Sequence, residues 1–147
     1  MFRFRGQEKD TGKWVEGYFY RRNDGAGYMI LGNISCCGKI TCSHFIVPNT
    51  LSISTGQFDK NRVEIFGSFE VDGKMSKGGD MVKLHYGIPP TSDTLVIEFV
   101  DNQVFNDFYV SGFWMRNLNK NRHSASLHKE YQNDLEIIGK QCDEVQK

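Results

Sequence analysis

The stretch TLVIEFVDNQVFNDFYVSGFWM, residues Thr94–Met115, decides the fold class of this chain. It is dominated by β-branched and aromatic side chains, which fit the pleated, half-buried surface of a sheet and lose rotamer freedom in a helix. The pair Asp101-Asn102 stands between two apolar segments, and such residues favour a tight turn. The stretch therefore predicts two long neighbouring strands, over Thr94–Val100 and Val104–Met115.

The same preference extends over the whole chain. Val, Ile, Thr, Phe, Tyr and Trp number 45 of the 147 residues, whereas Ala and Leu, the strongest apolar helix formers, number 9. Turn residues punctuate the sequence at short intervals, as is typical of all-β domains. We therefore predict a mainly β protein, built as a twisted antiparallel sheet or a partly closed barrel. One short helix is predicted near the C-terminus, at Ala125–Gln132, with Ser124 as its N-cap.

Length and composition limit the classes of protein to which the chain can belong. Its length fits one domain, predicted to span 1–147 with a polar tail, 140–147, that frays. No apolar run approaches the roughly 18 residues of a membrane span, and the first residues lack the apolar core of a signal peptide. The 18 basic and 18 acidic residues cancel, so no attraction of the whole chain to nucleic acid or an anionic membrane is expected.

Four cysteines are present, and three of them lie close to a histidine. Adjacent Cys36 and Cys37 cannot easily pair with each other, and no export signal is seen, so we expect reduced thiols and a cytoplasmic location. Cys37, Cys42 and His44 are weak candidate metal ligands, because thiolate and imidazole bind zinc. Their Cys-x4-Cys-x-His spacing matches no frequent zinc pattern, so small buried or loop thiols are the favoured interpretation.

A basic stretch follows the two long predicted strands. Cations that follow phosphates and rings that stack on bases are what single-strand binding surfaces use. The simpler alternative is a solvated loop whose charge balances the acidic C-terminal tail. The candidate nucleic-acid-binding residues are Trp114, Arg116, Lys120, Arg122, His123 and Lys129.

Two further features are open to a structural or a functional interpretation. Gly78-Gly79-Asp80 precedes a strand rather than a helix and lacks a following Lys-Ser/Thr, so it is not a phosphate-binding P-loop. We expect a turn in which glycine supplies a positive φ and Asp80 bonds backbone amides. Aromatic clusters such as Tyr18-Phe19-Tyr20 are expected to fill the core. If several of these rings are exposed together, a partner interface becomes the better interpretation.

Three stretches carry a resemblance to a known family. Phe4-Arg5 with Asp10–Tyr18 opens the chain, Val47–Val82 follows, and Leu135–Gly139 comes last. In this order they resemble the YopX family of phage and prophage proteins, and together they frame nearly the whole chain. The middle stretch is the specific part. It contains Thr55-Gly56, Asp59-Lys60-Asn61, Val63–Phe66 and Gly79–Val82 in the order of the family pattern TG, DKNG, EIYEGDIV.

The chain departs from that pattern at three places. Arg62 stands where the family usually has Gly, and Gly78 replaces an acidic residue. About a dozen residues, with a candidate hairpin at Asp72-Gly73, separate Phe66 from Gly79. The resemblance implies a compact, mainly β domain of phage or prophage origin and no established reaction, so we predict no catalytic residues and no cofactor.

We therefore predict a non-enzymatic phage or prophage accessory protein that acts through protein–protein contacts, with itself as a homo-oligomer or with another protein, and not on a membrane. Oligomerisation would also cover exposed strand edges. One alternative is a nucleic-acid-binding β-barrel that uses residues 116–129. A second alternative is a small metal-dependent enzyme.

Overall fold

The computed structural model describes residues 3–22, 27–34, 40–87, 91–105, 108–119, 122–127 and 129–145. Strands dominate them, which confirms the predicted mainly β class. The strands are β1 (Phe4–Gln7), β2 (Trp14–Arg21), β3 (Tyr28–Ile34), β4 (Ile40–Phe45), β5 (Ser52–Phe58), β6 (Glu64–Gly67), β7 (Glu70–Val71), β8 (Lys74–Met75), β9 (Asp80–Tyr86), β10 (Thr91–Phe105), β11 (Phe108–Asn117), β12 (Arg122–Ser126) and β13 (Leu135–Lys140).

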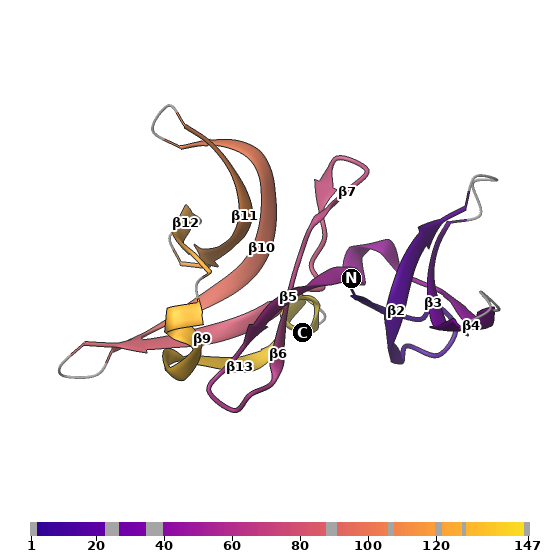
Figure 1. The fold of residues 1–147 in the computed structure, drawn as a ribbon, viewed down its shortest axis with the longest axis horizontal. Coiled ribbons are helices and arrows are strands. Elements are labelled where there is room, and N and C mark those ends of the chain that lie inside the picture. Colours follow the sequence, from indigo (N-terminus) through magenta and orange to yellow (C-terminus); the bar gives the residue numbers. More distant parts are fainter. Residues whose placement is uncertain are drawn as a thin grey trace.

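The strands form two larger sheets and one small hairpin. The first sheet has the order β4-β3-β2-β1-β5-β6, the second has the order β12-β11-β10-β9-β13, and β7 pairs with β8. Every pair between neighbouring strands is antiparallel. In Figure 1, β2, β3 and β4 lie at one end of the molecule and β10, β11 and β12 at the other, with β5, β6, β9 and β13 between them. The sheets are twisted but do not close into a barrel.

The quoted stretch forms the two longest strands. Strand β10 pairs with β11 from Leu95↔Asn117 to Phe105↔Phe108, and the two bend together strongly in Figure 1. The predicted turn at Asp101-Asn102 is wrong, because β10 runs through both residues with a shift in register between Val100 and Gln103. A β-bulge of this kind bends a strand and increases its twist without ending it.

The helical parts of the described chain are short, and the α-helix near the C-terminus lies later than predicted. Residues 125 and 126 belong to β12, so the helix expected at Ala125–Gln132 is wrong in its position. A 3-10 helix, η2 (Lys129–Asp134), overlaps the end of that range, and another, η1 (Pro48–Thr50), precedes β5. The short α-helix near the C-terminus is α1 (Gln141–Val145), in the segment expected to fray, and it buries Cys142 to 4% exposure.

Buried apolar side chains form two hydrophobic clusters among the described residues. Ile30, Ile46 and Leu51 are fully buried against the first sheet, where Phe4, Phe19 and Phe69 pack around them. The second cluster is centred on Ile65 from β6 of the first sheet and on Val82, Leu95, Ile97, Met115 and Leu135 from the second sheet. Burial of aliphatic side chains of this size is the main stabilising contribution to such a fold.

A buried ion pair joins the two sheets between these clusters. Arg5 on β1 donates from Nη2 to Asp80 Oδ1 on β9 and to the Gly78 carbonyl oxygen, each at 2.9 Å. Asp80 Oδ2 accepts the Phe66 N–H at 2.8 Å, and the Arg5 guanidinium lies 4.4 Å from the centre of the Phe66 ring. Burial raises the pKa of the Asp80 carboxyl, although the nearby Arg5 charge acts in the opposite direction.

The two glycines before Asp80 allow this close approach. Neither has a positive φ, so the expected left-handed turn is wrong. A Cβ on Gly79 would lie 2.5 Å from the Ser68 nitrogen, and one on Gly78 would overlap the Thr50 carbonyl group. The glycines are therefore required by backbone packing. Asp80 does bond a backbone amide, as expected, but that of Phe66 on another strand.

The loop after β5 holds the last strand of the second sheet. Asp59 is buried, and its Oδ1 accepts the N–H groups of Asn61 and Val63, each at 2.9 Å. Its Oδ2 accepts the Ile137 N–H on β13 at 3.1 Å, and the Lys60 N–H donates to the Leu135 carbonyl at 2.8 Å. This loop therefore covers the outer edge of β13.

Candidate functional site: an exposed aromatic face

The outer face of the first sheet carries exposed aromatic rings near β4. Alternation along β2 places Tyr18 and Tyr20 on one face and Phe19 on the other. The register pairs Tyr20 with Met29 on β3 and Met29 with Phe45 on β4, so Tyr20 and Phe45 lie in one cross-strand row. Arg22, just beyond β2, lies with its guanidinium 5.9 Å from the centre of the Phe45 ring. We call Tyr18, Tyr20, Arg22 and Phe45 the aromatic face.

The two sides of β2 differ sharply in exposure. Tyr18, Tyr20 and Phe45 are 36%, 47% and 37% exposed. On the other side, Phe19 stacks on Tyr28 with ring centres 5.6 Å apart and packs near Phe4 and Phe69. The core is therefore filled by the inward aromatic residues, and the expectation that the whole Tyr18-Phe19-Tyr20 cluster lies in the core holds for Phe19 alone. Outward rings grouped in this way are typical of binding surfaces.

The aromatic face adjoins an edge strand. Strand β4 is the last strand of the first sheet. The turn that follows β1 makes backbone contacts with the end of β4. There the Lys9 N–H donates to the Phe45 carbonyl at 2.9 Å, and Glu8 forms an isolated bridge with Ile46. The backbone beneath Phe45 is therefore fixed, which favours a preformed surface.

The histidine of the candidate metal cluster has a carboxylate partner. Nδ1 of His44 lies in hydrogen-bond contact with the Glu8 carboxylate, and Thr11 donates to the same carboxylate. Hydrogen bonds from His44 and Thr11 lower the pKa of Glu8. Cys36, Cys37 and the side chain of Cys42 lie outside the described residues. Within the part of the chain that is described, no three His, Cys, Asp or Glu side chains form a metal-binding group.

The basic stretch is only partly described. Arg116 Nε donates to Glu98 Oε1 at 2.8 Å, and Glu98 is only 4% exposed. Glu98 alternates with apolar residues along β10, yet it is buried because β6 and its following residue Ser68 cover this part of β10. Trp114 is half-buried and lies opposite Ser126 on β12. Lys120 and the side chains of Arg122, His123 and Lys129 lie outside the described residues.

Sequence reasoning found part of the aromatic face. Alternation along a strand places Tyr18 and Tyr20 on the same side, so this part of the face follows from the sequence. Phe45 and Arg22 were missed, because Phe45 joins the face through pairing across β3 and Arg22 lies beyond the end of its strand. A strand-pairing prediction for 14–45 could have found Phe45.

Comparison of the chain with protein-family models, curated proteins and solved structures finds no match. Among the described residues, no helix is long and apolar enough to span a membrane.

Proposed function

We propose that this protein is non-enzymatic and acts through protein–protein contacts, with the aromatic face as its binding surface and a second copy of the chain as the occupant. The observation that carries the proposal is the exposure of Tyr18, Tyr20 and Phe45 together on one sheet face. Tyr and Arg are enriched at the energetic centres of protein interfaces, where a ring supplies area and a hydroxyl or guanidinium supplies hydrogen bonds.

Charge and area both favour a second copy. The formal net charge is zero, so two copies approach without overall repulsion. The exposed parts of three aromatic side chains supply roughly 250 Å² of the about 800 Å² that a stable interface buries on each partner. They suit the centre of a larger contact, and the adjoining edge strand β4 offers the remaining area and backbone hydrogen-bonding groups.

The resemblance to the YopX family supports a phage or prophage origin, and we propose the accessory role on that basis. A nucleic-acid-binding role has less support. Rings and an arginine can also stack on bases, but the first cation of the basic stretch, Arg116, is paired with Glu98.

The test is the oligomeric state of the protein and of one double variant. Size-exclusion chromatography with light scattering, from low to high micromolar protein, should show self-association of the wild type and its loss in Tyr18→Ser/Tyr20→Ser. Tyr86→Ser is the matched control, because Tyr86 is 48% exposed and lies outside the aromatic face. A wild type that stays monomeric throughout, or a double variant that associates unchanged, contradicts the proposal.

A second measurement separates nucleic acid from protein as the occupant. Binding of labelled single- and double-stranded oligonucleotides is followed at about 50 mM salt and during a salt titration, since phosphate contacts weaken steeply with salt. We expect no binding. Salt-sensitive binding that Tyr18→Ser/Tyr20→Ser abolishes would instead assign the aromatic face to nucleic acid.

A further inference from the structure

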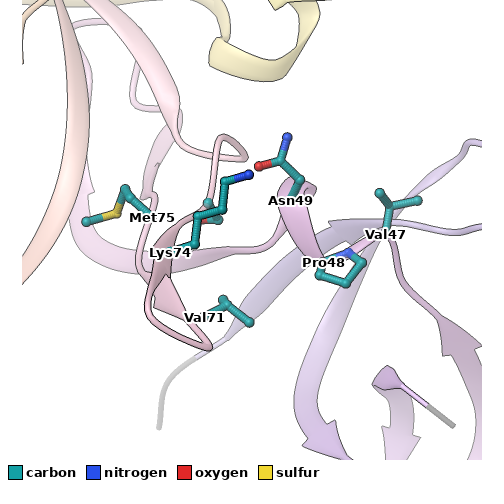
Figure 2. A pocket seen from close by; sticks show the side chains of 7 residues that line it. Val47, Pro48, Asn49, Val71, Lys74 and Met75 are labelled. Atoms are coloured by element: carbon teal, nitrogen blue, oxygen red, sulfur yellow. The ribbon is translucent and has the colours of Figure 1, made fainter.

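A groove of about 260 Å³ lies between η1 and the β7–β8 hairpin, and none of its lining residues belongs to the aromatic face. Val47 and Pro48 line one wall and Val71 and Met75 the other, so most of its surface is apolar. Lys74 and Asn49 also line this groove, and Figure 2 shows their side chains, which end in an ammonium and a carboxamide group. The groove thus combines an apolar lining with two polar groups at its rim.

Both walls are held in place by hydrogen bonds. Ser76 Oγ donates to the Leu51 carbonyl at 2.5 Å, and the Lys77 N–H donates to the Asn49 carbonyl at 2.7 Å. These two bonds join the base of the hairpin directly to η1 and to the residue after it. The groove is therefore preformed, which lowers the entropic cost of binding.

The tip of the hairpin is anchored as well. Arg21 Nη1 on β2 lies 3.0 Å from Asp72 Oδ1, and the Tyr28 hydroxyl on β3 donates to the same carboxylate. Asp72 is thus occupied by partners on the first sheet. It does not neutralise the Lys74 ammonium two residues away.

Lys74 gives the groove its charge preference. Within the described residues, the Lys74 ammonium forms no ion pair or hydrogen bond. The acidic residues Glu70 and Asp101 do not line this groove. They line a separate pocket, which Met75 also borders. A cation without a carboxylate partner beside an apolar surface is complementary to a ligand that joins an apolar group to an anion.

We propose that this groove binds an extended acidic peptide, with an aliphatic side chain between Val47, Pro48 and Val71 and a neighbouring carboxylate on Lys74 and Asn49. The volume is slightly below the about 300–1,000 Å³ typical of small-molecule sites, and it suits side chains of a peptide laid along a groove. The carboxylate accepts from the Lys74 ammonium and the Asn49 amide N–H₂. This site is independent of the aromatic face and of the self-association proposed there.

The probe is an N-acetylated hexapeptide of alternating leucine and glutamate, and its counterpart has lysine in place of glutamate. Binding is followed by amide and methyl chemical shifts of the full chain in low salt. We expect the acidic peptide to shift Val47, Val71 and the Asn49 side-chain amide, and to bind more tightly than the basic peptide. Equal binding of both peptides, no binding at millimolar peptide, or shifts confined to the aromatic face would overturn the proposal.

Charge reversal tests the role of Lys74. Lys74→Glu should weaken binding of the acidic peptide about tenfold and strengthen that of the basic one, since attraction becomes repulsion. Lys13→Glu changes the net charge equally at an exposed site outside the groove and should leave both affinities unchanged. Unchanged affinities in a folded Lys74→Glu protein, or equal changes in Lys13→Glu, refute the assignment. Tyr18→Ser/Tyr20→Ser should leave peptide binding intact, so the two proposals fail separately.

Discussion

The buried pair of Arg5 and Asp80 should be strongly coupled to the stability of the whole fold. Three variants test this: Arg5→Met, which keeps a long apolar side chain beside Phe66; Asp80→Asn, which keeps an acceptor for the Phe66 N–H; and the double variant. Arg5 and Asp80 are 9% and 2% exposed, so neither charge can regain full hydration when its partner is removed.

The magnitude follows from that burial. Removing one partner of a buried ion pair costs about 3–5 kcal/mol, because the remaining charge is left uncompensated in a medium that solvates it poorly. We expect about 3–4 kcal/mol for Arg5→Met, which leaves Asp80 with the Phe66 N–H. Asp80→Asn should cost about 2–3 kcal/mol, because Arg5 keeps its bond to the Gly78 carbonyl and its contact with the Phe66 ring. The double variant should cost clearly less than the sum of the single losses.

The pH dependence of Arg5→Met has a definite sign. Burial raises the pKa of Asp80 above that of the unfolded chain, so the native state binds more protons between the two values and stability falls as pH rises through that window. The Arg5 charge lowers the pKa of Asp80, so its loss in Arg5→Met raises that pKa further. The pH range in which the native state binds the extra proton then extends to higher pH. The destabilisation by Arg5→Met should therefore be smaller at about pH 5 than at about pH 7.5.

Urea unfolding followed by tryptophan fluorescence provides the assay. Trp14 reports on this region, because its ring centre lies 5.3 Å from the Arg5 guanidinium and 4.7 Å from Lys140 Nζ. The free energy of unfolding is measured at both pH values for the wild type and the three variants. Strictly additive losses, or an Arg5→Met loss that is the same at both pH values, would refute the reasoning.

Three other perturbations test parts of the fold that depend on single side chains. Asp59→Ala should lower the free energy of unfolding by about 3 kcal/mol in urea unfolding, because the Ile137 N–H and two loop amides lose their acceptor; Asp59→Asn should cost less. Arg62 has φ 62°, so Arg62→Gly should raise the stability by about 0.5–1 kcal/mol, and any loss contradicts this. His44 lowers the pKa of Glu8, so ionised Glu8 stabilises the fold at pH values above the pKa that Glu8 has in the unfolded chain. This stabilisation is lost as the pH falls through the pKa of Glu8 in the folded protein. The melting temperature of Glu8→Gln should therefore fall less on acidification than that of the wild type.

The prediction of strands succeeded where local composition determines backbone shape. Branched and aromatic side chains indicated two long neighbouring strands here, but Val104 and Phe105, predicted to begin the second strand, are the end of β10. Asp101-Asn102 favours a turn and is accommodated in a bulge instead. The pairing of β10 with β11 continues on both sides of these residues, and its many cross-strand contacts outweigh a two-residue turn preference. The strand at Ser52–Phe58 shows the converse, since its Ser, Thr and Gly residues carry a weak local signal and it forms a strand nonetheless.

Burial on the second sheet could not be predicted from alternation. Glu98 alternates with apolar residues, which indicates an outward position on an isolated strand, but Ser68 and Arg116 enclose it. The helix was misplaced because residues 125 and 126 pair with β11, whereas Gln141–Val145 becomes helical with Cys142 buried. In each case the deciding contact comes from a segment distant in sequence.

The sequence by itself determined the mainly β class and the alternation that places Tyr18 and Tyr20 on one side of β2, because these depend on steric preferences of adjacent residues. Only the tertiary structure decided what those faces meet. Pairing through β3 placed Phe45 in one cross-strand row with Tyr20, and the close approach at Gly78 and Gly79 buried Arg5 with Asp80. The hairpin anchored at Asp72 formed one wall of the groove with Lys74 at its rim. These arrangements depend on contacts between residues far apart in the chain, which local preferences do not encode.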